Sequence, residues 1–350
     1  MNDFEKITDF SNLYKAYKKA KSGKHYRKSS GRFQVRCLDG INRIKQSLEE
    51  HTYKPAQYYE KYVYEPKKRL IKIAPFQDCI VQHSLCDNVL IPHTEKIFID
   101  NNCAGRINKG TSYGLNLLKH HIQEFYDEFG MDGYILKADI TKFYYNIDHQ
   151  ILKDLLRLYY DNENVLWLCD VIIDSTDNPG LPLGNQSSQV FASLYLNQLD
   201  HLITQEANIK YARYADDFYI IHQSKSYLIE KLSMIEEHLN SIHLTLNGKT
   251  QIMPFKQGIK FLGFHTYIEN GTVNCKISND KKRNAYRKYV KMAKNVVAGK
   301  TEFEKFNECY TAFKAHAAFG DCEDMLNNLD IRINEIIKNE EQQHETTITN

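Results

Sequence analysis

The sequence lacks the features that would place the chain in a membrane or send it across one. No apolar run among its 350 residues approaches the length of about 18 residues that a membrane-spanning helix needs. The first residues, 1–6, carry charge where a secretory signal would need apolar side chains. We therefore expect a soluble, cytoplasmic protein that has no membrane partner.

The sequence also lacks the cysteine spacing of a zinc site or a disulfide framework. The eight cysteines include no Cys-x-x-Cys pair and no closely spaced cluster with histidine. We expect scattered, reduced thiols, most of them buried as small apolar residues. Internal repeats and low-complexity segments are missing too, and 42% hydrophobic residues are enough for a core, which excludes wholesale disorder. The length predicts roughly two domains.

Net charge is small, but the charges are placed unevenly. The 46 basic and 44 acidic residues sum to +2, which by itself indicates no nucleic-acid partner. Residues 11–36 nevertheless contain nine basic side chains and no acid, and residues 276–300 contain nine with one acid. A single run of this kind is commonly a solvated helix face. Two runs that flank one core favour a polyanion as partner, and they leave the remainder of the chain more acidic.

The hydrophobic pattern predicts mixed helix and strand. Residues 134–140, 209–214 and 218–221 are apolar and rich in strand formers, and short strands are expected at 244–246 and 260–264. Helical periodicity occurs at residues 85–98, 111–129, 149–160, 188–206 and 227–241, and residues from 281 onward look all-helical. The polar residues 338–350 are expected to form a disordered tail.

Two adjacent carboxylates, Asp216 and Asp217, lie in the turn between two predicted strands. Like charges in contact repel, so the pair is costly unless a cation lies beside it. Asp139 ends another apolar strand and reaches the same place if the two strands are neighbours. Such hard oxygen ligands favour Mg²⁺, and two Mg²⁺ ions support phosphoryl transfer. An Asp pair taken alone is more often an ordinary hairpin turn.

Six segments resemble the ordered motifs of reverse transcriptases. Residues 137–149, which contain Asp139, and 214–217, which contain the carboxylate pair, resemble the two catalytic motifs. The fingers segment, the template-side loop and the two segments after the catalytic turn are matched by residues 66–78, 180–189, 246–250 and 261–264. The resemblance spans residues 36–330 and implies an RNA-directed DNA polymerase.

The resemblance implies a fold and a division of the chain. The fold would be the α/β (α+β) right-hand polymerase arrangement of fingers, a palm with an antiparallel sheet, and a helical thumb. Residues 1–35 would form a basic N-terminal extension and 36–268 the interleaved fingers and palm. Residues 269–337 would form the thumb, followed by the tail at 338–350, which leaves no length for a maturase or endonuclease domain.

The resemblance also implies roles at the catalytic centre. Asp139 and Asp216 would bridge two Mg²⁺ ions, which Mn²⁺ can replace, and Asp217 would tune or share the site. The backbone carbonyl of Ile140 would hold the nucleotide-bound ion. Lys249 would protonate the departing pyrophosphate as general acid, although a lone lysine in a turn is otherwise a solvated residue.

The expected substrates are deoxynucleoside triphosphates, an RNA template and the cDNA product. Tyr144 matches the bulky gate that crowds a ribose 2′-hydroxyl, or else it is a core aromatic residue. The other nucleotide-binding residues would be Lys67, Lys68 and Arg69, which grip the triphosphate, and Leu183, Gly184 and Gln189. The template backbone and the duplex would be bound by Arg106, Lys109, Lys281, Lys282, Arg283, Arg287 and Lys288.

Departures from the commonest pattern indicate a subtype. Leu183-Gly184 and Ser188-Gln189 stand where bacterial group II intron enzymes usually have Gln-Gly and Ser-Pro. This pairing is similar to reverse transcriptases of diversity-generating retroelements, as are residues 194–201 and, faintly, 310–321. In that family the apolar residue accompanies error-prone copying of template adenines. Loss of one amide hydrogen bond, worth about 0.5–1.5 kcal/mol, is enough to weaken base discrimination several-fold.

Other interpretations stay open. Short, divergent reverse transcriptases also serve anti-phage defence with a dedicated non-coding RNA, and Gln77 and Cys79, in place of common arginines, indicate divergence. The partner would then be another defence protein, whereas a retroelement would supply a small helical accessory protein. A catalytically silent scaffold suits the basic runs, but it has no reason to keep three repelling carboxylates. Template-independent addition, or priming from one of 24 tyrosines, is a further alternative.

Overall fold

The computed structural model describes residues 1–23, 28–64, 68–206 and 208–348, and it divides into two compact units. Unit 1 comprises Met1–Gly110, Ala138–Phe218 and Ile229–Thr250. Unit 2 comprises Thr111–Lys137, Tyr219–Leu228 and Gln251–Asn350. The chain passes between the units several times, so each unit is built from segments that are far apart in the sequence.

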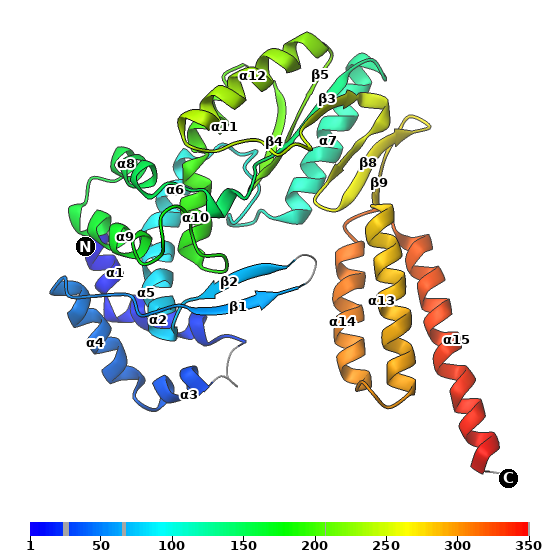
Figure 1. Cartoon of the computed structure of the whole chain (residues 1–350), viewed down its shortest axis with the longest axis horizontal. Coiled ribbons are helices and arrows are strands. Elements are labelled where there is room, and N and C mark those ends of the chain that lie inside the picture. The colour runs from blue at the N-terminus through cyan, green and yellow to red at the C-terminus, as the bar shows by residue number, and fades with distance from the viewer. Residues whose placement is uncertain (24–27, 65–67, 207, 349–350) are drawn as a thin grey trace. The chain divides into compact units, whose positions relative to one another are not determined.

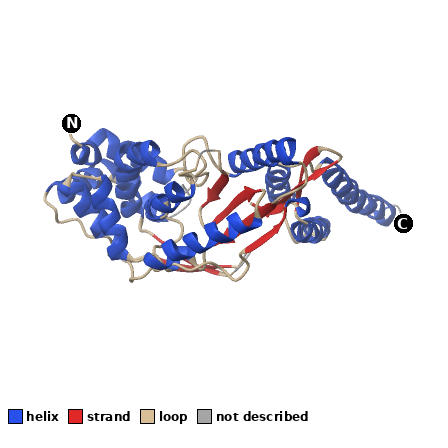
Figure 2. Cartoon of the chain, turned by 90° about the horizontal axis from the view of Figure 1, so that it is seen from above, coloured by secondary structure: helices blue, strands red, loops and turns tan. Residues whose placement is uncertain are grey.

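Unit 1 is mostly helical, as the blue ribbons around the N-terminus show in Figure 2. Its first part contains α1 (Asp3–Thr8), α2 (Phe10–Lys21), α3 (Lys28–Val35), α4 (Cys37–Glu49), α5 (Phe76–Leu85), a π-helical turn (Cys86–Leu90) and α6 (Ile91–Ile97). Its later part contains a 3₁₀ turn (Phe143–Tyr145), α8 (His149–Tyr159), α9 (Glu163–Ile173), α10 (Gln186–Tyr195), α11 (Asn197–Ile203) and most of α12 (Lys225–Ser241).

The basic N-terminal residues fold into this core. Asp9 caps the start of α2, where its side chain accepts a hydrogen bond from the N–H of Asn12. Leu13, Tyr17 and Ala20 recur at helical spacing and are buried. In the predicted basic N-terminal extension, residues 1–35, α2 packs against α5 and α4 within unit 1.

A β-hairpin lies between α4 and α5 in the chain (Figure 1). Its strands, β1 (Tyr59–Val63) and β2 (Arg69–Ile73), pair antiparallel, with Tyr59 opposite Ile73 and Val63 opposite Arg69. Lys68 and Arg69 are exposed where the second strand begins. The third predicted triphosphate ligand, Lys67, lies outside the described residues.

A four-stranded sheet carries the predicted carboxylates at the ends of its strands. Its order is β4-β5-β3-β6, built from β3 (Tyr134–Asp139), β4 (Lys210–Tyr214), β5 (Asp217–His222) and β6 (Gln251–Pro254). β3 and β6 are antiparallel, with Tyr134 opposite Pro254 and Lys137 opposite Gln251. Four consecutive residues of β5, Phe218 to Ile221, are buried, so this strand lies inside the fold.

Unit 2 contains a three-stranded sheet and a three-helix bundle. The antiparallel strands β7 (Ile259–Phe261), β8 (Phe264–Glu269) and β9 (Thr272–Ile277) follow a 3₁₀ turn (Phe255–Gln257), and α7 (Thr111–Phe129) packs on β8 and β9. The helices α13 (Asn279–Val297), α14 (Phe303–Ala317) and α15 (Glu323–Ile348) run side by side in Figure 1. Tyr289, Phe306, Tyr310 and Leu329 form their shared core.

Most predicted elements are confirmed, including the helix at 111–129, whose bounds equal those of α7. The helix predicted at 188–206 is instead two helices, because the backbone leaves the helical conformation at Leu196. The strand predicted at 244–246 contributes a single bridge, between Ile140 and Leu246. The segment 338–348 continues α15, which corrects the prediction of a disordered tail; its Lys, Glu and Gln residues favour helix.

Two composition-based expectations can be compared with the structure. Five of the eight cysteines are buried, and the other three are half-buried, which agrees with their prediction as small apolar residues. No helix in the described part of the chain is both long and apolar enough to cross a membrane.

Candidate active site

Two of the predicted catalytic carboxylates come together in unit 1. Asp216 lies in the two-residue turn between β4 and β5, and Asp139 is the last residue of β3. The N–H of Ile140 donates to the carbonyl of Asp216 at 3.1 Å, which ties the end of β3 to the turn. The Asp139 carboxylate lies close enough to Asp216 to raise the pKa of its carboxyl group.

The surroundings of Asp216 disfavour its negative charge. Burial raises the pKa of Asp216, and the neighbouring Asp139 carboxylate raises it further, while the Arg69 guanidinium opposes the rise. A divalent cation would relieve this repulsion, and carboxylate oxygens are the ligands it prefers. The donor pair therefore fits a divalent metal ion.

Asn247 holds the Asp139 carboxylate in place. Its N–H donates to the carbonyl of Asp139 at 2.7 Å, and its side-chain amide donates to Asp139 Oδ2 at 3.2 Å. The Oδ1 of Asn247 accepts a hydrogen bond from the N–H of Lys249 at 3.1 Å, and the Lys249 side chain is exposed. Sequence reasoning assigned no role to Asn247, although an Asn-Gly pair in a turn is a signal for side-chain hydrogen bonding to backbone.

The place of Asp217 differs from that of Asp216. Among the described residues, no three His, Cys, Asp or Glu side chains are arranged to hold a metal ion together. Asp217 is the first residue of β5, where successive side chains point to opposite faces, whereas Asp216 belongs to the turn. One carboxylate oxygen of Asp217 is buried. The structure thus brings Asp139 and Asp216 together, and the convergence of Asp217 with them stays a prediction.

A buried ion pair supports the turn that carries Asp216. Ala215 has φ +55°, which is strained for a residue with a Cβ atom, and Arg213 Nη1 donates to its carbonyl at 3.0 Å. Arg213 Nε in turn donates to Asp200 Oδ1 at 2.7 Å, and both side chains are 0% exposed. The hydroxyl of Tyr211 donates to the same oxygen at 2.6 Å. The sequence signal for this network is an acidic residue, Asp200, between the apolar residues Leu199 and Leu202 of a helical segment.

The predicted nucleotide gate lies beside the carboxylates. Tyr144 is half-buried, and burial raises the pKa of its hydroxyl to about 12, with a smaller contribution from the charge of Asp216. Its ring packs against that of Phe143, with 5.4 Å between centroids. The N–H of Leu181 donates to the carbonyl of Tyr144 at 2.7 Å. This hydrogen bond joins the template-side segment, residues 180–189, to the predicted gate residue.

The template-side segment approaches the hairpin that carries Arg69. Leu183 is half-buried, and Gly184 is exposed with φ +104°. A Cβ atom at Gly184 would lie 3.4 Å from a methyl carbon of Ile71 in β2, which is an ordinary contact, so glycine is favoured here by the positive φ and not by lack of space. Gln189 is exposed and lies next to Gly105.

Arg106 and Lys109, predicted to contact the template backbone, are used inside unit 1. The Arg106 side chain is 5% exposed and forms a forked ion pair with Glu95, in which Nη2 and Oε2 are 2.7 Å apart. The ammonium of Lys109 donates to the carbonyl of Asp100 at 2.6 Å, and its side chain is 11% exposed. A phosphate contact needs an exposed cation, so the structure corrects both assignments to structural roles.

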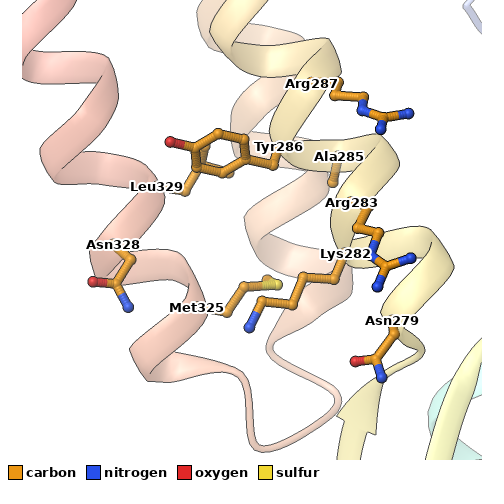
Figure 3. Close-up of a pocket in the computed structure, with 9 residues that line it drawn as sticks. All are labelled: Asn279, Lys282, Arg283, Ala285, Tyr286, Arg287, Met325, Asn328 and Leu329. Carbon is orange, nitrogen blue, oxygen red and sulfur yellow. The ribbon is translucent and has the colours of Figure 1, made fainter.

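The cations predicted to bind the duplex lie on α13 in unit 2. Lys282, Arg283, Arg287 and Lys288 are exposed. Figure 3 shows Lys282 and Tyr286 extending from α13 toward α15, whereas Arg283 and Arg287 extend away from it. They border a cavity of about 540 Å³ between the two helices. Lys281 lies over the backbone of Gly263, where no Cβ atom obstructs it, and burial lowers the pKa of its ammonium.

Comparison with solved structures supports the fold. The chain is similar to the structure of telomerase from Candida albicans in complex with a fragment of telomeric RNA, with a TM-score of 0.51 and 12% sequence identity. The similarity covers 82% of this chain and 55% of that chain, so this chain spans about half the length of the telomerase chain. At this identity the likeness concerns the fold alone, and it agrees with the predicted mixed helix and antiparallel-sheet polymerase class.

Comparison with family models identifies the family. No curated protein sequence matches the chain. Residues 66–266, more than half of the 350, match the model described as reverse transcriptase (RNA-dependent DNA polymerase). The matched segment contains both juxtaposed carboxylates, the gate tyrosine and the hairpin arginine. The chain therefore belongs to the reverse transcriptase family, whose members are RNA-dependent DNA polymerases.

Proposed function

We propose that the chain copies an RNA template into DNA by metal-dependent nucleotidyl transfer. The observation that carries this proposal is the proximity of Asp139 and Asp216, which the backbone holds together although burial and the neighbouring Asp139 carboxylate disfavour the charge of Asp216. A protein keeps such an arrangement where a divalent cation balances it. The family match over residues 66–266 supports the same reaction.

Asp139 and Asp216 would hold two Mg²⁺ ions, or Mn²⁺ in their place, together with the backbone carbonyl of Ile140. Bound there, the ions would lower the pKa of the primer 3′-hydroxyl and neutralise charge on the departing pyrophosphate. Asn247 keeps one carboxylate oriented, because it donates both to the backbone carbonyl and to the side chain of Asp139. Asp217 tunes the site from the start of β5.

The neighbouring residues would bind and select the incoming nucleotide. Arg69 and Lys68 are exposed at the start of β2 and the end of its preceding loop, and the guanidinium acts on the pKa of Asp216, so its charge lies near the reacting centre. We assign the triphosphate to these cations. Tyr144 would exclude a 2′-hydroxyl, which selects deoxynucleotides. Lys249 would donate a proton to pyrophosphate as general acid.

Primer extension on an RNA template with Mg²⁺ tests the reaction. Wild-type protein should extend the primer, and Asp216→Asn/Asp217→Asn should abolish extension. Asp132→Asn/Asp161→Asn, which removes two exposed carboxylates outside the site, is the matched control and should keep activity. No metal-dependent incorporation by the wild type would contradict the proposal and favour a nucleic-acid-binding scaffold. DNA-linked tyrosine peptides, detected by mass spectrometry, would identify protein priming.

We further propose error-prone copying at template adenines, of the kind found in diversity-generating retroelements. The support is Leu183, an apolar and half-buried residue next to Gly184 and β2, where related enzymes usually carry an amide. Copying a defined RNA with balanced nucleotides should give errors concentrated at adenines, and Leu183→Gln should reduce them several-fold. A uniformly low error rate in the wild type would contradict this proposal.

A role in anti-phage defence is the second candidate, and the divergent residues Gln77 and Cys79 in the fingers segment favour it. In either role the template would be a dedicated RNA in the cytoplasm. Sequencing the nucleic acid that co-purifies with the protein distinguishes the two. A template repeat next to a variable-protein gene, with a gene for a small helical accessory protein, supports the retroelement; a structured non-coding RNA beside another defence gene supports defence.

A further inference from the structure

Besides the cavity between α13 and α15, the structure has a second cavity, which lies in unit 1. It has a volume of about 970 Å³ and is lined by residues of α3, α4, the loop before β1, the start of β1, and the end of β2 with the beginning of α5. Neither Asp139 nor Asp216 lines it. A cavity of this size accommodates one or two nucleotides.

The cavity is lined by four cations, Arg32, Arg36, Arg43 and Lys54, all of them exposed. Among the described residues, none of the four forms an ion pair. Its one acidic lining residue, Asp78, is buried, and it accepts hydrogen bonds from the Tyr53 hydroxyl at 2.7 Å and the Ala56 N–H at 3.0 Å. The charge presented to solvent is therefore positive, and it suits an anion with several phosphate groups.

Aromatic rings line the same cavity. Phe33 of α3 and Phe76 of α5 pack with 5.4 Å between ring centroids, and both line the cavity. Gly40 of α4 allows this packing, since a Cβ atom there would lie 2.7 Å from the Phe33 ring. Tyr59, the first residue of β1, also lines the cavity and is 68% exposed, which leaves its ring free for stacking on a base.

Exposed arginines combined with an exposed aromatic ring match the chemistry of single-stranded nucleic acid, whose phosphates need cations and whose unpaired bases stack on rings. Bases of a duplex are already stacked and cannot reach a ring inside a concave surface. We infer that this cavity binds a single-stranded polynucleotide, with phosphates on Arg36 and Arg43 and a base on Tyr59. The inference rests on the proposed function, for which single-stranded RNA is the template.

Binding of a labelled twelve-nucleotide oligo(U) to the full chain tests the cations. Fluorescence anisotropy between 50 and 200 mM salt gives the dissociation constant and its salt dependence. Each phosphate contact with a single strand contributes about 0.7 to the slope of log K against log salt, so Arg36→Gln/Arg43→Gln should lower the slope by about 1.4. Lys96→Gln/Lys256→Gln removes two exposed cations that do not line the cavity and should leave the slope nearly unchanged.

Two variants of Tyr59 test the stacking contact. Tyr59→Ala should weaken binding of oligo(U) by about 5- to 100-fold, while Tyr59→Phe, which keeps the ring, should bind like the wild type. Oligo(dT) tests DNA. If Tyr59→Ala loses affinity for oligo(U) alone, the cavity binds RNA; if it loses affinity equally for both, the cavity binds single-stranded RNA and single-stranded DNA. A blunt RNA duplex should lose little affinity in any of these variants.

Several outcomes would overturn the inference. Equal slopes for Arg36→Gln/Arg43→Gln and the lysine control would show that the cavity contacts no phosphate. Equal losses with single strand and duplex would show only a general charge effect, and wild-type binding by Tyr59→Ala would exclude stacking. Circular dichroism and thermal unfolding establish that each variant is folded. Binding is measured without nucleotides, and primer extension by the wild type is measured separately, so failure here and failure of the proposed polymerase reaction are distinguishable.

Discussion

The buried pair of Arg213 and Asp200 makes a sharp prediction about the turn that carries Asp216. In Asp200→Asn the side chain keeps its shape, but the Arg213 guanidinium is left in the core without a counter-charge. Both side chains are fully buried, so water cannot replace the lost carboxylate without opening the structure. The Tyr211 hydroxyl still finds an oxygen acceptor in the amide of the substituted side chain, so the expected loss comes mainly from the arginine.

Removing one partner of a buried ion pair costs about 3–5 kcal/mol. That is a large part of the roughly 5–15 kcal/mol that stabilises a folded domain. Replacing all polar members by apolar ones, in Asp200→Leu/Arg213→Met/Tyr211→Phe, should be nearly neutral for folding because no buried charge or hydroxyl remains. This triple variant nevertheless lacks the donor that Arg213 Nη1 provides to the Ala215 carbonyl at 3.0 Å.

Urea unfolding and primer extension measure the two effects separately. We expect Asp200→Asn to lower the free energy of unfolding by at least about 3 kcal/mol, and the triple variant to change it by less than about 1 kcal/mol. The triple variant should still lose roughly 10- to 100-fold in kcat, because the strained turn that positions Asp216 is released. A loss below about 1 kcal/mol for Asp200→Asn, or wild-type kcat for the triple variant, would refute the reasoning.

Three further predictions concern the site and the α13 surface. Tyr144→Val should raise ribonucleotide incorporation by roughly 10- to 100-fold, whereas Tyr144→Phe should keep selectivity; equal selectivity for all three proteins in competition assays would exclude the gate. The pKa of Asp216 is raised in the folded state. The stabilisation that follows from this shift is therefore fully present below the unfolded-state pKa of the carboxyl group, and it is lost as the pH rises through the folded-state pKa. Metal-free Asp216→Asn should therefore be more stable than the wild type at pH 7, with the gap closing toward pH 4 in urea titrations; a pH-independent gap would contradict this. Lys282→Gln/Arg287→Gln should lower the salt slope of duplex binding by about 0.9 for each phosphate that these two side chains neutralise, and an unchanged slope would remove them from the interface.

Local sequence patterns predicted many elements correctly because their determinants are local. Apolar periodicity and a possible cap at Thr111 or Ser112 predict the helix at 111–129, and both act within the segment itself. Two β-prone flanks predict a turn at residues 215–217, and its adjacent carboxylates indicate a cation by charge alone; in the structure the turn is Ala215–Asp216. The tail at 338–348 shows the reverse case, since polarity suggested disorder where the residues favour helix.

The sequence does not predict the function of a side chain whose hydrogen-bond or ion-pair partner is brought near it only by folding. Arg106 looked like a template contact because an arginine before a helix start suits a phosphate, but Glu95 neutralises it in the fold. Asn247 and Arg213 have no distinctive spacing relative to Asp139 and Asp200, so their hydrogen bonds follow only from the packing.

The sequence by itself determined the family, through six ordered motifs, and the residue types of the catalytic centre, because side-chain chemistry is local. Only the tertiary structure decided that the Asp139 and Asp216 carboxylates lie near each other, since they come together through neighbouring strands while Asp217 starts the strand beyond the turn. It also decided which basic residues remain available to a polyanion. Arg106 is paired with Glu95 inside the fold, whereas Arg36, which precedes α4, and Arg43, within α4, line one cavity and are exposed.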